Sequence, residues 1–221
     1  MFHILAILKR REDLSPEDFQ AHWRGPHADL ARKIPGLRRC VQNRTLLSGY
    51  RAHSPICDGV AELWFDDAAG FERANASPEM AAAQADLEEF VSKEGARIMR
   101  LESRSIVAGA APADGVKLIS FLTRRQDLSR EQFSAHWHDR HGPIAARIPG
   151  MRRYLQYHAV EDARFGPTLY DGVPVAWFED TDALRASEPS DAYARTRADE
   201  AHFLEPDRIR FVIAREFEVL D

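Results

Sequence analysis

Runs of apolar residues with a strand-like period occur at matching places in two halves of the chain. The first of them, His3–Lys9 and Lys117–Thr123, open the two halves. Stretches with helical spacing, including residues 77–92 and 190–204, separate the later runs. Each half therefore has the predicted order β-α-β-β-α-β, which is a ferredoxin-like unit. The further predicted strands are Leu37–Thr45, Gly59–Phe65 and Ile98–Val107, and Met151–Val160, Gly172–Phe178 and Phe211–Val219.

The first helix of each half has a recognisable start. Ser15 suits the N-cap position, and Pro16 suits the first helical position. Leu14 and Phe19 are placed to pack together as a hydrophobic staple. Ser129 has the N-cap role in the second half. We therefore expect a helix to begin at the same place in both halves.

One face of this helix carries a tryptophan and a histidine. Trp23 and His27 share a helical face because they are one turn apart, and so do Trp137 and His141. A proline lies close to each histidine, and proline interrupts an α-helix because it lacks an N–H group. Each histidine is therefore predicted to sit at a kink or a helix restart.

The two halves also repeat specific residues. Residues 13–43 and 127–157 both carry D-L-S-x-E-x-F-x-A-H-W-x-x-x-H followed by I-P-G-x-R-R-x-x-Q. The motif D-G-V-x-x-x-W-F recurs at Asp58–Phe65 and Asp171–Phe178. A repeat of about 110 residues indicates a duplicated unit. We predict two domains, residues 1–108 and 117–221, joined by a linker at 109–116.

A ferredoxin-like unit covers only one face of its sheet with helices. Two such sheets can bury their other faces by packing against each other. The predicted fold class is therefore α+β, with two ferredoxin-like βαββαβ repeats packed sheet-to-sheet into an intrachain α+β barrel. The covalent link gives one half a high effective concentration for the other.

The repeated motifs resemble those of the EthD family of dimeric α+β barrel proteins. The resemblance rests on R-x-D-L-S-x-E-x-F-x-x-H-W, on the histidine four residues after the tryptophan, on I-P-G-x-R-R and on D-G-V-x-x-x-W-F. It covers nearly all of both halves, so the chain resembles a tandem EthD protein. Residues 141–143, His-Gly-Pro, match the family motif, whereas Gly25-Pro26 precedes His27. Glu62, which corresponds to Val175, is a second difference between the copies.

The resemblance implies a small-molecule enzyme. The barrel superfamily includes cofactor-free monooxygenases, polyketide cyclases, dehydratases, lactone isomerases and haem enzymes. EthD-like members are linked to ether degradation and to fungal polyketide dehydration or decarboxylation. A shared fold does not select one of these reactions.

Three residues are candidates for catalysis. His27 and His141 titrate near neutral pH and can take and return a proton. The alternative is that each histidine bonds a carbonyl and fixes the kink. Glu62 shares a strand face with Val60 and Trp64, where apolar surroundings would raise its pKa. Its alternative role is an ion pair with an arginine such as Arg38 or Arg39.

Further residues are candidates for binding the substrate. His22 and His136 lie beside the tryptophan face and line or rim a pocket, or are structural. The two tryptophans pack in the core or form the wall of a site for a flat ligand. Arg39 holds an anionic group inside the barrel or forms a salt bridge. The second half adds a more aromatic strand with Tyr154, Tyr157 and His158.

Composition and charge argue against several other classes of protein. The net charge of −5 is not that of a nucleic-acid-binding protein, and no apolar run has the length of a membrane span. Cys40 and Cys57 are the only cysteines, which predicts no structural disulfide and a cytoplasmic location. His136, His138 and His141 do not complete a metal site, since no thiolate or carboxylate pattern accompanies them.

The leading hypothesis is a cofactor-free lyase, dehydratase or isomerase. It would act in the interior of the barrel on a small oxygenated molecule, such as an aromatic or polyketide-like compound. The first alternative is a haem-binding two-repeat barrel protein. The second is a non-catalytic small-molecule carrier or partner subunit. We also expect that the outer helices can support a homodimer.

Overall fold

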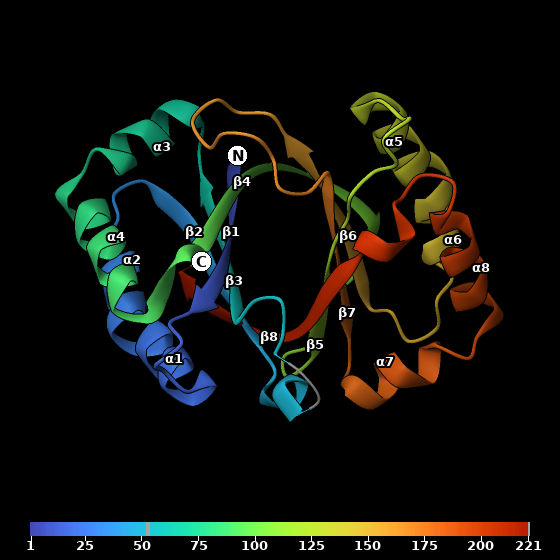
Figure 1. Cartoon of the computed structure of the whole chain (residues 1–221), viewed down its shortest axis with the longest axis horizontal. Helices are drawn as coiled ribbons and strands as arrows, with labels where there is room; N and C mark the ends of the chain where they lie inside the picture. Colours follow the sequence, from blue (N-terminus) through green and yellow to red (C-terminus); the bar gives the residue numbers. More distant parts are fainter. Residues whose placement is uncertain (52–53, 221) are drawn as a thin grey trace. The chain divides into compact units, whose positions relative to one another are not determined.

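The computed structural model describes residues 1–51 and 54–220 and has a mixed α+β fold (Figure 1). The strands are β1 (Phe2–Arg10), β2 (Leu37–Thr45), β3 (Gly59–Phe65), β4 (Val91–Val107), β5 (Val116–Phe121), β6 (Arg153–Val160), β7 (Gly172–Phe178) and β8 (Arg210–Leu220). The α-helices are α1 (Pro16–His22), α2 (Ala28–Ala31), α3 (Ala68–Asn75), α4 (Pro78–Phe90), α5 (Arg130–His136), α6 (Gly142–Ala145), α7 (Thr181–Ser187) and α8 (Asp191–Glu200). Two π-helical segments, η1 (Trp23–His27) and η3 (Trp137–His141), and two 3-10 segments, η2 (Leu47–Arg51) and η4 (Pro206–Arg208), complete the fold. None of the helices in the described ranges is both long and apolar enough to cross a membrane.

The strand order confirms the predicted fold class. β4-β1-β3-β2 and β8-β5-β7-β6 are two copies of one ferredoxin-like order. The hydrogen-bonded neighbours form the closed barrel β1-β3-β2-β8-β5-β7-β6-β4. The ladders within each copy, such as β1 with β3 and β5 with β7, are antiparallel.

Contacts divide the chain into two compact units that are not simply its two halves. The first unit contains residues 1–101 together with 162–167 and 216–221. The second unit contains residues 102–161 and 168–215. Two long strands, β4 and β8, therefore each contribute residues to both units. Two short pieces of the second repeat belong to the first unit, a detail that the repeat pattern does not reveal.

Each unit packs its helices on one face of its strands. In Figure 1, α1 to α4 lie together beside the strands of the first unit. Leu8 of β1 packs with Phe19, Trp23 and Phe90 from the helices in one buried cluster. The counterpart cluster in the second unit contains Leu122 with Phe133, Trp137 and Phe203. These clusters fix the first helix of each unit, together with the end of α4 in the first unit and the segment after α8 in the second, against the sheet.

The predicted helix start is present in both units. The Ser15 hydroxyl accepts a hydrogen bond from the Asp18 backbone N–H at 3.0 Å, and Pro16 is the first helical residue. Ser129 and Gln132 form a capping box in the second unit. Each capped helix satisfies N–H groups that its first turn would otherwise leave without partners.

The predicted kinks are π-helical segments. Pro26 lies inside η1, whereas Pro143 follows η3, yet the two segments occupy the same place in the repeat. A π-helical turn inserts one extra residue and turns the following side chains to a new direction. This device places His27 and His141 at the ends of their segments.

The long helices end earlier than the apolar pattern suggests. The predicted helix 77–92 ends at Phe90, and residue Val91 already has extended backbone angles and pairs with Arg10. The strand predicted to begin at Ile98 thus begins at Val91. The predicted helix 190–204 ends at Glu200. Pairing with a neighbouring strand overrides helical periodicity at these ends.

Candidate functional site

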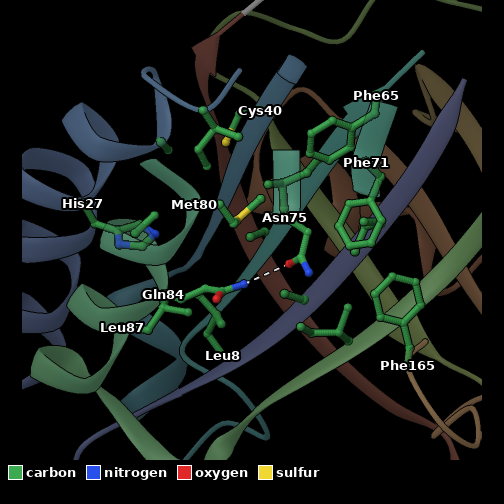
Figure 2. A pocket seen from close by; sticks show the side chains of 18 of the residues that line it. Leu8, His27, Cys40, Phe65, Phe71, Asn75, Met80, Gln84, Leu87 and Phe165 are labelled. Carbon is green, nitrogen blue, oxygen red and sulfur yellow. Dashed lines mark hydrogen bonds between the residues drawn. The ribbon is translucent and has the colours of Figure 1, made fainter. Parts of the chain in front are cut away.

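A cavity of about 550 Å³ lies between the helices and the sheet of the first unit (Figure 2). Figure 2 shows His27 at one end and Phe165 at the other. The amides of Asn75 and Gln84 lie between them and are joined by a hydrogen bond of 3.2 Å. The rest of the lining is mostly apolar, with Gln42 as a further amide. The cavity suits a mostly apolar molecule that carries a few polar groups.

His27 is held in this cavity by a carboxylate. Its Nδ1 lies 2.8 Å from Asp86 Oδ2 in α4. His22 holds the same carboxylate from the other side, with its Nε2 3.0 Å from Oδ1. We assign the His27 proton to Nδ1, because a carboxylate can only accept, which leaves Nε2 as an acceptor. His22 thus orients Asp86 and does not itself line the cavity.

Burial lowers the pKa of His27, and the hydrogen bond and negative charge of Asp86 oppose that shift. The imidazole is therefore neutral at neutral pH. A neutral imidazole with a free Nε2 can accept a proton, and Asp86 would stabilise the imidazolium ion that forms. The arrangement is that of a general base supported by a carboxylate.

The second unit repeats this pair. His141 Nδ1 lies 2.9 Å from Asp199 Oδ2, and His136 Nε2 lies 3.2 Å from the same carboxylate. Burial also lowers the pKa of His141. However, Tyr154 stands where the first unit has Cys40, and its side chain is buried at 3% exposure. Tyr154 therefore fills space that corresponds to the cavity.

The two aspartates were not predicted from the sequence. Asp86 and Asp199 occupy the same place in the two repeats, four residues before Phe90 and Phe203. Their distance along the chain from the histidines hides the contact. Their repetition is the signal that could have revealed them, because few other charged positions match between α4 and α8.

Glu62 lies on the other face of the sheet. Its neighbours Ala61 and Leu63 line the cavity, and alternate residues of a strand point to opposite faces. Glu62 is 1% exposed and accepts a hydrogen bond of 2.8 Å from Asn43 Nδ2. Its other oxygen lies 3.4 Å from His3 Nε2. The structure therefore does not bring Glu62 together with His27.

The remaining predicted binding residues are spread over several places. Arg39 forms an ion pair with Glu218 at 2.6 Å and lies over the Trp64 ring, so its salt-bridge interpretation holds in the first unit. Tyr157 is buried in the second unit at the place that corresponds to Asn43. His158 borders a separate polar groove of about 580 Å³. Burial lowers the pKa of His158 to about 3.

The tryptophans pack tightly against glycines. A Cβ atom on Gly59 would overlap with the Trp23 ring, and one on Gly172 would overlap with the Trp137 ring. Both indoles are almost completely buried, which agrees with a core role, and Trp23 also lines the cavity. This packing explains why a glycine occupies the second position of both D-G-V motifs.

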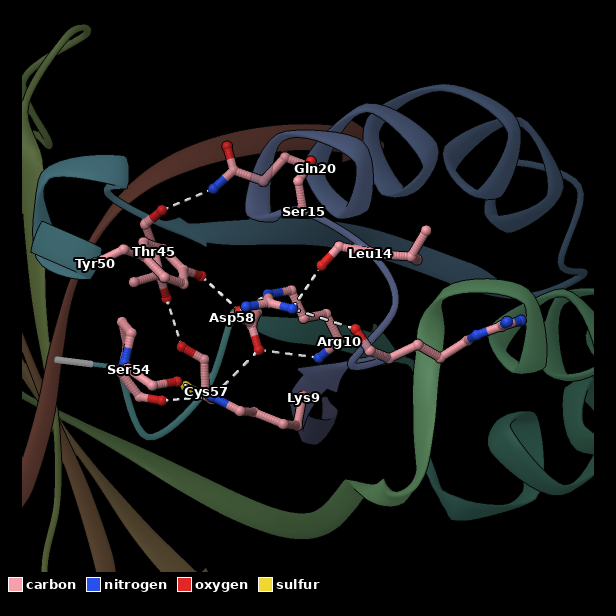
Figure 3. Close-up of polar contacts among 12 residues, drawn as sticks. Lys9, Arg10, Leu14, Ser15, Gln20, Thr45, Tyr50, Ser54, Cys57 and Asp58 are labelled. Atoms are coloured by element: carbon pink, nitrogen blue, oxygen red, sulfur yellow. Dashed lines mark hydrogen bonds and ion pairs between the residues drawn. The ribbon is translucent and has the colours of Figure 1, made fainter.

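The aspartate of the D-G-V motif has a structural role (Figure 3). Asp58 is fully buried and accepts hydrogen bonds from the Arg10 backbone N–H at 2.9 Å and from the Tyr50 hydroxyl at 2.7 Å. Nε of the Arg10 guanidinium lies 3.1 Å from Asp58 Oδ1, the oxygen that also accepts from Tyr50. Asp58 thus ties the end of β1 to the start of β3. It is not close enough to the cavity to be among its lining residues.

Other candidate chemistry is limited. Cys40 and Cys57 are buried and not joined in a disulfide, and burial raises the pKa of each thiol to about 12. Such thiols are poor nucleophiles at neutral pH. Within residues 1–51 and 54–220, no group of three or more His, Cys, Asp or Glu side chains is arranged to hold a metal ion.

Comparisons with known proteins agree with this fold. The EthD domain family model matches residues 11–94 and 125–207. No curated protein matches the sequence. An anthrone oxidase-like protein of known structure has 11% identity and a TM-score of 0.70, covering 100% of this chain and 94% of its own. A mutant chlorite dismutase from Candidatus Nitrospira defluvii has 13% identity and a TM-score of 0.53, covering 99% and 92%. At these identities the likeness shows the fold alone.

Proposed function

Because the chain belongs to the EthD family, we propose that the first unit is an active site in which His27 transfers protons on a small oxygenated molecule. The observation that carries the proposal is the His27–Asp86 pair at an apolar cavity. A neutral, buried base beside apolar walls suits removal of a weakly acidic C–H or O–H proton. We place the reaction in the lyase, dehydratase or isomerase class.

An elimination illustrates how the residues would act. His27 Nε2 removes a proton from the carbon next to a substrate carbonyl, and Asp86 stabilises the imidazolium. The C–H electron pair forms the new double bond as the β-hydroxyl leaves. The imidazolium returns its proton to that hydroxyl, so water is released and His27 is neutral again. In an isomerisation, the proton returns to another carbon of the substrate.

Two features support the first unit as the working half. Its cavity contains His27, whereas Tyr154 occupies the corresponding space in the second unit. The amides of Gln42, Asn75 and Gln84 can bind substrate oxygen atoms. The sheet separates Glu62 from this cavity, so the mechanism uses no second acid at that position.

Replacement of the two histidines tests the proposal. We expect His27→Gln to lower kcat/KM on any accepted substrate by about 100- to 10,000-fold, the usual contribution of a general base. His141→Gln is the matched control and should retain activity. A broad panel of hydroxy-carbonyl compounds, phenols and lactones supplies the substrates. Full turnover by His27→Gln would refute the proton-transfer role.

The same variants separate this function from haem binding. Haemin is added to the wild-type protein and to His27→Gln, and the visible spectrum is recorded. A Soret band that appears only with His27 present would make this histidine an iron ligand and overturn its role as a base. Spectra identical to free haemin in both proteins leave the proposed acid–base role in place.

A further inference from the structure

Two glutamines make the same contact in the two units. Gln42 Nε2 donates a hydrogen bond of 2.7 Å to the Trp23 carbonyl, and Gln156 Nε2 donates one of 2.8 Å to the Trp137 carbonyl. Both side chains are almost completely buried. Because a carbonyl oxygen only accepts hydrogen bonds, the amide nitrogen of each glutamine must point to the backbone carbonyl of the tryptophan. The orientation of both amides is therefore defined.

In the second unit a tyrosine uses the other N–H of this amide. Tyr154 Oη lies 3.2 Å from Gln156 Nε2, and burial raises the pKa of Tyr154 to about 12, so the phenol is neutral. Tyr154 and Gln156 are two residues apart on β6 and point to the same face. A phenol ring of the protein itself thus fills this space, with its hydroxyl at the amide.

In the first unit the same amide has room beside it. Cys40 replaces the tyrosine, and Cys40 and Gln42 both line the cavity. Within the described ranges, neither Gln42 Oε1 nor Gln156 Oε1 makes a hydrogen bond, so the two amides differ at Nε2. Gln42 Nε2 bonds only to the Trp23 carbonyl. A buried amide with unused hydrogen-bonding capacity favours a ligand that supplies the missing partner.

We infer that the first unit binds a neutral phenol, with the phenolic oxygen at Gln42 Nε2 in the position that Tyr154 Oη has in the second unit. His27 lines the same cavity and offers its Nε2 as an acceptor for the phenolic proton. The inference rests on the proposed function for the fate of the bound phenol. Binding itself does not depend on proton transfer by His27.

The charges around the cavity favour a neutral ligand. Arg164 is the cation that lines it, and this arginine is held by Asp162 at 2.6 Å and Glu72 at 2.8 Å. A carboxylate ligand would therefore compete with two protein carboxylates for its counter-ion. Flat aromatic walls, including Phe71 and Phe165, suit an aromatic ring instead.

Binding of p-cresol and toluene tests this inference directly. These molecules are the side chains of tyrosine and phenylalanine, and they differ by one hydroxyl group. We expect the full-length protein to bind p-cresol about three- to tenfold more tightly than toluene, as one net hydrogen bond allows. Ligand-detected NMR titration measures both affinities. Equal affinities in the wild-type protein would overturn the inference without any variant.

Substitution of the two glutamines assigns the contact. Gln42→Met should remove the preference for p-cresol over toluene, whereas the matched control Gln156→Met should keep it. A preference that survives Gln42→Met overturns the assignment of the hydroxyl to this amide. Circular dichroism of both variants confirms that the chain is folded.

Two substitutions of Cys40 test the comparison with Tyr154. Cys40→Tyr should place a ring in the cavity and weaken p-cresol binding at least tenfold, and Cys40→Ser should leave it unchanged. Unweakened binding by a folded Cys40→Tyr variant would refute the proposed position.

His27→Gln separates the two proposals. We expect this variant to bind p-cresol but to lose turnover. Retained turnover with Gln42-dependent p-cresol binding would refute only the proton-transfer function. Lost turnover without any preference for p-cresol would refute only the phenol inference.

Discussion

The two units contain the same histidine–aspartate pair but differ in the space beside it. In the first unit His27 lines a cavity, and in the second unit Tyr154 is packed into the corresponding place. The two units thus share the histidine–aspartate contact, and one strand position carries a small side chain in the first unit and a large one in the second. The two units therefore differ in whether a ligand has room beside the histidine–aspartate pair.

Helices α4 and α8, which occupy corresponding places in the two units, show the same difference. Leu87 of α4 lines the cavity, whereas the corresponding residue of α8 is Glu200. Burial raises the pKa of Glu200, and an ion pair with Arg197 opposes that shift. A charged pair at this place makes the helix face of the second unit less suitable for an apolar ligand.

Loss of a tryptophan should have the largest effect and should differ between the units. Trp137→Ala should cost about 3–5 kcal/mol of unfolding free energy, because it opens a hole in a filled core. Trp23→Ala should cost less, since one side of Trp23 already faces a cavity. Urea denaturation measures both values. A larger loss for Trp23→Ala would contradict the difference in packing.

Replacement of the two aspartates should affect activity differently in the two units. Asp86→Asn should lower kcat about 100-fold, because the carboxylate orients His27 and stabilises its charged form. Asp86 raises the pKa of His27, so the acid limb of the pH profile should move to lower pH in this variant. Asp199→Asn is the control and should leave the profile unchanged. Equal losses in the two variants would mean that both units are catalytic.

The motif glycines should show what the two units share. Gly59→Ala and Gly172→Ala each place a methyl group against a tryptophan ring, and each should destabilise the fold by about 1–3 kcal/mol. Thermal or urea unfolding compares them. The two values should agree, since the glycine–tryptophan contact is the same in both units. A neutral result at either site would contradict the tight packing described above.

The smallest predicted effect is a pH dependence of stability. The pKa values of His27 and His141 lie below the ordinary 6.5 in the folded protein. Between the folded pKa and 6.5 the unfolded chain binds more protons, so the free energy of unfolding falls as the pH is lowered through this window.

Urea midpoints at pH 7.5 and 5.5 measure this dependence. His27→Gln and His141→Gln should each reduce the difference between the two midpoints by a similar amount. An unchanged difference in the double variant would assign the pH dependence to other groups.

Most of the fold followed from local patterns in the sequence. The repeated N-cap serines, the aromatic helix face and the alternating strands are short-range signals, and duplication presents each of them twice. The EthD-like motifs then indicated a barrel of two ferredoxin-like repeats, which the strand order confirms. The residue type of His27 and its predicted place at a kink indicate a role in chemistry.

The site itself was only partly predictable because it depends on long-range contacts. Asp86 meets His27 across a large separation in sequence, and no local pattern links the two. Glu62 was placed correctly beside Val60 and Trp64, but the sequence does not tell which face the helices cover. Tyr154 was expected to bind substrate, whereas the structure shows it packed as part of the protein.

The shared strands have a consequence for any attempt to separate the repeats. A fragment that ends in the linker would lack residues 162–167 and 216–221, which belong to the first unit. It would lose Phe165 from the cavity and would leave the edge of β2 without its neighbour β8. An uncovered strand edge invites pairing with another chain. Separation of the repeats at the linker would therefore expose strand edges and yield fragments that tend to aggregate.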